Sequence, residues 1–286
     1  MAIDVTITQR LFGTKTMPLE VILGPHMQYG HLEADHLIVG KRGEKEILVY
    51  HPNYIGRGFS VIWHPGEKKQ LTLRLPMPAP EMEIRHFYAA VVRMAEYWKA
   101  KLNVDGQPMT KKVFMQGLEP MLHFNEGAIR RLADAIVKGE HEWMMLHSAM
   151  WPMAIGKEEA NRFLESPAAF GDWLHEKQSM DVYHAVVQLY KMETGSRGVF
   201  VCVDECPTVY PNAPKVPFGV MDENGKPLVC DEWKVAFVPQ SEKNAIGELD
   251  FADFAQRLGR ERVSRYDAGH FLMQPLTEQE MRQLLE

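Results

Sequence analysis

The chain has 286 residues, about two domain lengths, and its 45% hydrophobic and 24% charged residues exclude intrinsic disorder for most of it. The 21 glycines and 18 prolines are an ordinary share of the residues and exclude a collagen-like or low-complexity sequence. With 32 basic and 38 acidic side chains the formal net charge is −6. This charge argues against a general nucleic-acid binder, because phosphate binding needs a concentrated positive field.

The first residues and the cysteines indicate a compartment. A secretory signal would begin with basic residues and an apolar run, whereas this sequence begins with an acid, Asp4, and a strand-like alternation over residues 3–7. The uncharged stretch 143–156 contains Pro152 and is too short and broken to cross a bilayer. The chain has three cysteines, whereas an oxidised scaffold would have more and an even number, so we expect reduced thiols. We therefore expect a cytoplasmic protein without a membrane segment.

Short strands separated by turn signals dominate the first 76 residues. The predicted strands cover residues 3–8, 36–40, 46–50, 58–63 and 70–75. Their spacing of about ten residues favours antiparallel pairing, because a parallel connection needs a dozen or more residues. In the last strand Leu71, Leu73 and Leu75 alternate with Thr72 and Arg74, which predicts a sheet with one wet face.

A long helix is predicted after the stiff, proline-rich linker 76–80. Apolar side chains recur at helical spacing over residues 81–102, and 103–106 is predicted to end the helix with a turn. We place a domain boundary near residue 103. Residues 1–103 then form a strand-rich N-terminal part that ends in a long helix, and 104–286 form an α+β C-terminal part. A single intertwined domain is the alternative.

The second half of the chain mixes helices and strands. Asn125 is predicted to cap a helix over 126–138, and Ser166-Pro167 to start another. Residues 181–192 and 198–204 are predicted to form a hairpin, and the proline-rich segment 206–217 an irregular loop. Asp222-Glu-Asn-Gly225 is a hairpin-turn signal. Thr277-Glu-Gln-Glu280 is a capping box before a terminal helix, so the fold class is α+β with mainly antiparallel sheets and packed amphipathic helices.

Twelve histidines raise the question of a metal site. His26, His31 and His36 are five residues apart, so neither a helix nor a strand would bring all three imidazoles to one ion; a loop through Tyr29-Gly30 is the alternative. His141 and His147, with Glu142 beside the first, resemble a zinc-protease helix, but that motif needs histidines four residues apart. We expect solvated histidines and no metal or other cofactor.

The three cysteines are candidates for metal binding or redox chemistry: Cys202, Cys206 and Cys230. Three thiolates and a histidine make a zinc site in principle, but a second closely spaced pair is missing and no histidine lies near in sequence. We expect structural cysteines, with metal or redox chemistry as the alternative.

Motifs for nucleophilic catalysis and phosphate binding are incomplete. The G-x-S-x-G elbow is absent, and Phe12-Gly-Thr-Lys-Thr16 lacks the first glycine of a phosphate loop. Gly56-Arg-Gly58 is better explained as a β-turn than as a dinucleotide motif, although Arg57 is able to offer a guanidinium to an anion. The carboxylate pairs Glu44/Glu46, Glu158-Glu159 and Asp231-Glu232 are expected to be solvated.

Methionine is abundant, with 18 residues. Met144, Met145, Met150 and Met153 crowd one segment with Trp143 and Trp151. Such residues either fill an irregular core or form an adaptable protein-binding face. We expect core packing.

Residues 47–60, the alternating strand Leu71-Thr-Leu-Arg-Leu75 and the helix segment Ile84-Arg-His-Phe-Tyr88 resemble a bacterial family catalogued only as a domain of unknown function. The resemblance covers nearly the whole chain. It implies a bacterial cytoplasmic protein, and it supplies no activity, substrate or catalytic residue to transfer.

Two hypotheses of different class follow. The favoured one is a non-enzymatic protein-interaction or regulatory module that binds another protein or itself, and neither nucleic acid nor membrane. The alternative is an enzyme or small-ligand binder whose site is assembled from residues distant in sequence. The alternative predicts a deep pocket with converging polar groups, and with Arg57 or the 206–217 segment at its rim.

Overall fold

The computed structural model describes residues 1–9, 16–33, 36–63, 69–193, 195–217 and 220–286. The phosphate-loop candidate at 12–16 lies almost wholly outside these ranges. The chain forms two compact units, Met1–Ser179 and Met180–Glu286, called unit 1 and unit 2 below. The division into 1–103 and 104–286 stays a prediction; residue 103 lies within a strand of unit 1.

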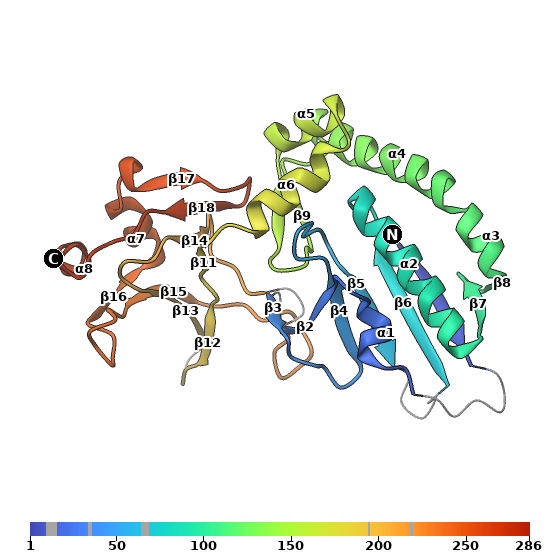
Figure 1. Ribbon diagram of the computed structural model, residues 1–286. Coiled ribbons are helices and arrows are strands. Elements are labelled where there is room, and N and C mark those ends of the chain that lie inside the picture. The colour runs from blue at the N-terminus through green and yellow to red at the C-terminus, as the bar shows by residue number, and fades with distance from the viewer. Residues whose placement is uncertain (10–15, 34–35, 64–68, 194, 218–219) are drawn as a thin grey trace. The chain divides into compact units, whose positions relative to one another are not determined.

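Unit 1 is built on an antiparallel sheet with strand order β3-β2-β4-β5-β6-β1-β7-β8 (Figure 1). The strands are β1 (Ala2–Thr8), β2 (Gln28–Glu33), β3 (His36–Val39), β4 (Glu46–Tyr50), β5 (Phe59–Trp63), β6 (Gln70–Pro76), β7 (Lys101–Val104) and β8 (Gln107–Met109). All five strands predicted in this region are present, and β2 was missed. Its sequence, with Gly30 and His31 at the centre, lacks a run of strand formers.

The face of this sheet that carries Leu71, Leu73 and Leu75 is buried by helices (Figure 1). The helices of unit 1 are α1 (Leu19–Leu23), α2 (Glu81–Trp98), α3 (Lys111–Gln116), α4 (Leu118–Val137), α5 (Lys157–Glu165) and α6 (Ala169–Gln178). Helix α2 lies across β1 and β6, and its predicted apolar stripe from Ile84 to Trp98 is buried in the core. A short two-stranded sheet, β9 (Met144–Leu146) with β10 (Met153–Ile155), completes the unit.

Two predicted helix boundaries in unit 1 are wrong. Helix α2 ends at Trp98, four residues early, because Lys99 turns left-handed with φ 48° and the chain enters β7. Asp105 and Gly106, with φ 47° and 85°, then form the β7–β8 hairpin turn, rather than a helix end. Helix α4 begins at Leu118, so Asn125 lies inside it and caps nothing.

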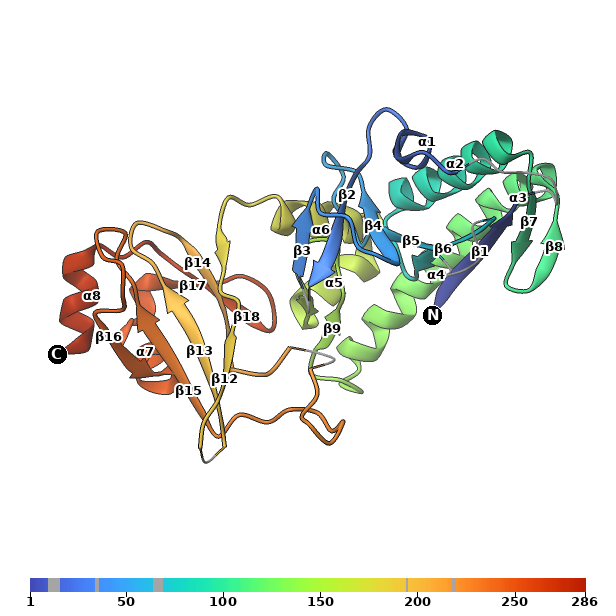
Figure 2. The ribbon, with the colours of Figure 1, turned by 90° about the horizontal axis from the view of Figure 1, so that it is seen from below.

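The described residues of unit 2 form two four-stranded sheets and two α-helices (Figure 2). One sheet has the order β12-β13-β15-β16 and the other β11-β14-β18-β17. Helices α7 (Phe251–Arg257) and α8 (Glu278–Leu285) pack against the first sheet. The strands are β11 (Tyr183–His184), β12 (Gln188–Lys191), β13 (Ser196–Cys202), β14 (Thr208–Pro211), β15 (Glu232–Phe237), β16 (Gly247–Asp250), β17 (Val263–Arg265) and β18 (His270–Met273), with a 3-10 turn at Arg260–Arg262.

The sequence predictions for unit 2 have mixed outcomes. The predicted hairpin is confirmed for β12 and β13, whereas Tyr183–His184 of its first strand form β11 and pair with β14. The capping box of α8 is confirmed by Thr277 Oγ1 accepting from the Glu280 amide at 3.2 Å. The 222–225 turn is present, closed by a single bridge between Met221 and Pro227. The prediction of an irregular loop over 206–217 is wrong at Thr208–Pro211, which is a fully buried strand. A proline is tolerated there because it stands at the end of a four-residue strand. The fold class, α+β with mostly antiparallel sheets, is confirmed.

Candidate functional site

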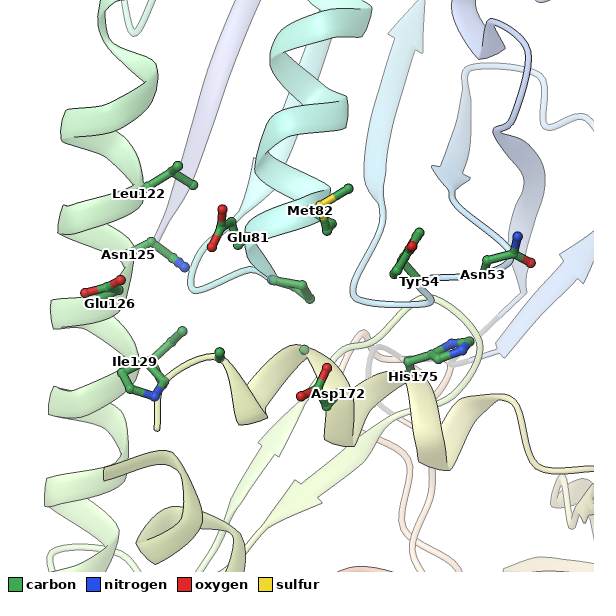
Figure 3. Close-up of a pocket in the computed structure, with 14 residues that line it drawn as sticks. Asn53, Tyr54, Glu81, Met82, Leu122, Asn125, Glu126, Ile129, Asp172 and His175 are labelled. Carbon is green, nitrogen blue, oxygen red and sulfur yellow. The ribbon is translucent and has the colours of Figure 1, made fainter. Parts of the chain in front are cut away.

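A pocket of about 400 Å³ opens in unit 1 where four segments meet (Figure 3). These segments are the loop 51–58 between β4 and β5, the start of α2, the middle of α4 and residues 167–175, which lead into α6. Apolar residues line much of it: Pro80, Met82, Leu122, Ile129, Pro167 and Ala168. Polar residues of the same segments also line it: Asn53, Tyr54, Glu81, Glu126, Asp172 and His175. The site is therefore assembled from residues distant in sequence.

Two prolines at helix starts shape this pocket. Pro80 precedes the first residue of α2, and Pro167 lies two residues before α6 begins. Pro80 is the N-cap residue of α2, and Pro167 stands just before Ala168, the N-cap residue of α6, so neither missing N–H interrupts a helix. A side chain at Gly171 would have its Cβ 3.1 Å from Pro80 Cβ, so glycine lets α6 approach the start of α2. The two helix starts thereby form adjacent walls of the pocket.

The buried amide of Asn125 connects α4 to the segment before α2. Its Oδ1 accepts a hydrogen bond from the Ala79 backbone N–H at 3.0 Å, and its Nδ2 donates to the Ala79 carbonyl at 2.8 Å. Asn125 is only 3% exposed and Ala79 is fully buried. The Asn125 side chain therefore supplies both hydrogen-bond partners that the backbone of Ala79, which lies outside any helix or strand, would otherwise lack.

The loop 51–58 is fixed by side chains of other elements. His175 Nδ1 accepts from the Ile55 N–H at 3.2 Å, and Gln178 Nε2 donates to the Gly56 carbonyl at 2.8 Å. Glu83 Oε2 accepts from the Gly58 N–H at 2.7 Å. The expected β-turn at 56–58 is thus a loop whose amides and carbonyls are bound by α2 and α6.

Arg57 does not face the pocket. Its Nε donates to the His147 carbonyl at 2.8 Å and its Nη1 to the Pro78 carbonyl at 3.0 Å. Burial lowers the pKa of Arg57 to about 10, although Glu83 opposes this shift. The expectation of Arg57 at the rim of a pocket is wrong for this site, because the guanidinium binds backbone carbonyls and ties 56–58 to its neighbours. The 206–217 segment belongs to unit 2 and does not line this pocket.

Glu83 is the buried acid beneath the loop. It is 5% exposed, and its Oε1 has no hydrogen-bond partner among the residues that the structure describes. Burial raises its pKa to about 7, against the opposing effects of the Gly58 N–H and of Arg57. The carboxyl therefore changes its charge near neutral pH.

We expect Glu83→Gln to raise the free energy of unfolding by about 2–3 kcal/mol at about pH 8 and by little at about pH 4.5. An unfolded carboxyl ionises near its model value of 4.5, whereas the folded one ionises near 7, so native stability is lost as the pH rises between these values. Glutamine keeps an acceptor for Gly58 and removes the buried charge. Urea unfolding at both pH values measures the effect.

The control is Glu96→Gln, an exposed change on the same helix. Equal destabilisation by Glu83→Gln at both pH values would contradict the prediction and would mean that the negative charge stabilises Arg57.

The lining of the pocket is acidic. Its charged side chains are Glu81, Glu126 and Asp172, and the described lining contains no lysine or arginine. Glu81 forms an ion pair with Arg85 at 2.8 Å. Within the described residues, no ion pair engages Glu126 or Asp172, and both are exposed to solvent.

The structure gathers histidines that the sequence did not group. The rings of His51 and His86 stack with centroids 4.8 Å apart, and His26 lies 6.2 Å from His51. His31 and His36 lie instead on β2 and β3, where His36 stacks on Trp151. His141 and His147 are exposed on either side of β9. No group of three or more His, Cys, Asp or Glu side chains among the described residues is placed to hold a metal ion.

Unit 2 holds a second polar constellation. Asp267 is buried, and its Oδ1 lies 2.8 Å from His270 Nδ1 and accepts from the Gly269 N–H at 2.8 Å. A carboxylate that orients a histidine is half of a catalytic triad. In the described residues no serine, threonine or cysteine is bonded to His270. The Tyr266 and Asp267 amides both donate to the His270 carbonyl, so the pair closes the turn between β17 and β18.

The cysteines are free thiols. Cys202 lies in the core of unit 2, and burial raises its pKa to about 12. Burial also raises the pKa of Cys230. Neither is activated as a nucleophile. Of the methionine-rich segment, Met153 is buried and Trp143 is 39% exposed, so the segment is part core and part surface.

The fold and the site define an α+β protein of two compact units, the first of which carries a pocket assembled from four segments. Residues 2–284 match the model of the family described as Domain of unknown function (DUF4299), and the chain belongs to that family. The resemblance inferred from the sequence is thereby confirmed. No curated protein and no solved structure matches the chain. Of the helices in the described ranges, none has the length and apolar character that a membrane span requires.

Proposed function

We propose that unit 1 binds a small organic ligand that joins an apolar body to a positive charge. The observation that carries the proposal is the pocket of about 400 Å³ that apolar and acidic residues of four segments line. Its volume is in the range of about 300–1,000 Å³ that small-molecule sites occupy. This is the alternative hypothesis of the sequence analysis, a ligand binder with a site assembled from distant residues.

The side chains of the pocket favour a cation over an anion. The apolar part of a ligand would contact Leu122 and Ile129, and a positive group would lie near Glu126 and Asp172. An anion would meet three carboxylates and no lysine or arginine of the described lining. Because both carboxylates are exposed, each contributes only about 0.5–1 kcal/mol to binding a cation.

The test compares benzylamine, benzyl alcohol and benzoate as probes by calorimetry at low salt. We expect benzylamine to bind most tightly and benzoate most weakly. The double variant Glu126→Gln/Asp172→Asn is expected to weaken benzylamine binding by about five- to thirtyfold. Ala168→Trp, which fills the pocket from the start of α6, is expected to abolish binding of all three probes.

The matched control is Glu140→Gln/Glu165→Gln, which removes the same charge from exposed positions of unit 1 outside the pocket. It is expected to leave benzylamine affinity unchanged. If benzoate binds as tightly as benzylamine, or if Ala168→Trp leaves binding intact, the proposal fails.

The interaction hypothesis favoured from the sequence stays a prediction, and so does the absence of nucleic-acid binding. A light-scattering molar mass that rises with protein concentration would support self-association. For the compartment we propose the cytoplasm, supported by three free cysteines that fit a reducing environment. Fractionation of the source cells with detection of the native protein tests it, and recovery outside the cytoplasm would contradict it.

A further inference from the structure

The first half of the loop 51–58 is held by one backbone hydrogen bond, from the Tyr54 N–H to the His51 carbonyl, and by two bonds to histidine side chains. The Asn53 N–H donates to His51 Nδ1 at 3.1 Å, and the Ile55 N–H donates to His175 Nδ1 at 3.2 Å. A ring nitrogen that accepts a hydrogen bond carries no proton, so both imidazoles must be neutral for these bonds to exist. On protonation each Nδ1 becomes a donor that faces another donor.

The second half of the loop is held by groups of a different kind. The Gly56 carbonyl accepts from Gln178 and from the Ala149 N–H, and Arg57 donates to two backbone carbonyls. Glu83 accepts from the Gly58 N–H, and it does so in either protonation state. Only the first half therefore depends on neutral imidazoles, and this half presents Asn53 and Tyr54 to the pocket (Figure 3).

The surroundings of His51 oppose its protonation. His86 on α2 stacks on it with an interplanar angle of 9°, His26 approaches from the segment before β2, and His175 approaches from α6. Burial, followed by the neighbouring histidines, lowers the pKa of His51. The same causes, with Arg93 in addition, lower the pKa of His86. Once one ring is charged, each further charge in this cluster is repelled by the first.

Other charged groups in this region lie on the packed elements around the loop. Asp172 lies one turn before His175 on α6, and Glu83 and Arg57 lie at the far half of the loop. No carboxylate is among the groups that shift the pKa of His51 or His86 in the described structure.

We propose that residues 51–55 form a pH-sensitive wall of the pocket, closed while His51 and His175 are neutral and loosened at the hydrogen bond of each imidazole that takes up a proton. The release itself follows from two hydrogen bonds to imidazole acceptors. Its consequence for a ligand rests on the proposed function, because Asn53, Tyr54 and His175 line the same pocket. Acidification would then lower ligand affinity without unfolding unit 1.

Amide hydrogen exchange of the full chain, measured by NMR at about pH 7.5 and about pH 5.5, tests the release. Rates are divided by the intrinsic rate at each pH. We expect protection of the Asn53 and Ile55 amides to fall by about tenfold or more at the lower pH. The Ala149 and Met150 amides, which donate to Gly56 and Gln178, are expected to keep their protection.

Two variants separate imidazole titration from general acid loosening. His51→Asn/His175→Gln offers amide oxygens that do not titrate, and it is expected to remove the pH dependence at both amides. His123→Gln, an exposed change on α4, is expected to leave that dependence intact. A direct NMR titration of His51 and His175 in the unmodified chain must show protonation over the pH range in which protection is lost.

Protection that is equal at the two pH values, or a pH dependence that persists in the double variant, overturns the proposal. The outcome of the benzylamine experiment is independent of this test. If the amides are released at the lower pH and benzylamine binds at neither pH, the pH-sensitive wall stands and the proposed ligand is wrong.

Discussion

Replacement of Asn125 by leucine is expected to lower the free energy of unfolding of unit 1 by about 2–6 kcal/mol. Leucine fills a similar volume but leaves the N–H and the carbonyl of Ala79 without their partners. Both groups are buried, and each orphaned buried polar group costs about 1–3 kcal/mol. Urea unfolding followed by tryptophan fluorescence reports on unit 1, because all tryptophans except Trp233 lie there.

The matched control for this change is Asn161→Leu, at an exposed position on α5, which is expected to change stability by less than about 0.5 kcal/mol. The same reasoning predicts that Asn125→Leu weakens benzylamine binding, because Ala79 positions Pro80 at the pocket. A loss of stability below about 1 kcal/mol would show that the Ala79 backbone finds other partners.

The second large effect is acid destabilisation of unit 2 through His184. This residue is 9% exposed, and its ring lies edge-on to Tyr266 with centroids 5.4 Å apart. Burial, and then the nearby His270, lower the pKa of His184 to about 3, against the opposing effect of Asp267. The folded unit thus holds a histidine that stays neutral over most of the acid range.

The sign of the effect follows from proton linkage. The unfolded histidine takes up a proton below its model value of 6.5, whereas the folded one remains neutral until about 3. The contribution of neutral His184 to the free energy of unfolding is therefore fully present above about pH 6.5 and is lost as the pH falls toward 3. At about pH 4.5 the loss is about 2–3 kcal/mol.

Hydrogen exchange of the most protected amides in β13 and β15 measures this loss for unit 2 alone. His184→Gln cannot be protonated in this range, so its stability is expected to vary much less between about pH 8 and about pH 4.5. The exposed histidine change His123→Gln is expected to behave like the unmodified chain. An equal pH slope in the His184 variant would assign the acid sensitivity to other groups.

The local structure of this protein was largely predictable where periodicity was strong. The stripe from Ile84 to Trp98 predicted the buried face of α2, and the alternation of Leu71, Leu73 and Leu75 predicted β6. These signals are reliable because the burial of one face by a helix or strand leaves a pattern of fixed period. The end of α2 was predicted four residues too late, since Leu102 continues the apolar spacing although it belongs to β7.

The pocket was not predictable from single motifs. Nothing in the sequence around Asn125 distinguishes a cap from a side chain that binds Ala79 across the core, 46 residues away. The prolines at 80 and 167 were local signals for two helix starts, and folding brings these two starts together as adjacent walls of the pocket. The histidine spacing drew attention to His26, His31 and His36, whereas the cluster unites His26 with His51 and His86.

The sequence alone determined the α+β class, most strands of the first sheet, the long amphipathic α2 and membership in a recognisable family. These properties depend on composition and on contacts between near neighbours in the chain. Only the tertiary structure decided that Arg57 binds backbone carbonyls, that Glu83 is buried and that His175 accepts from Ile55. Those properties depend on hydrogen bonds and burial between segments brought together by folding, and such contacts leave no periodic trace in the sequence.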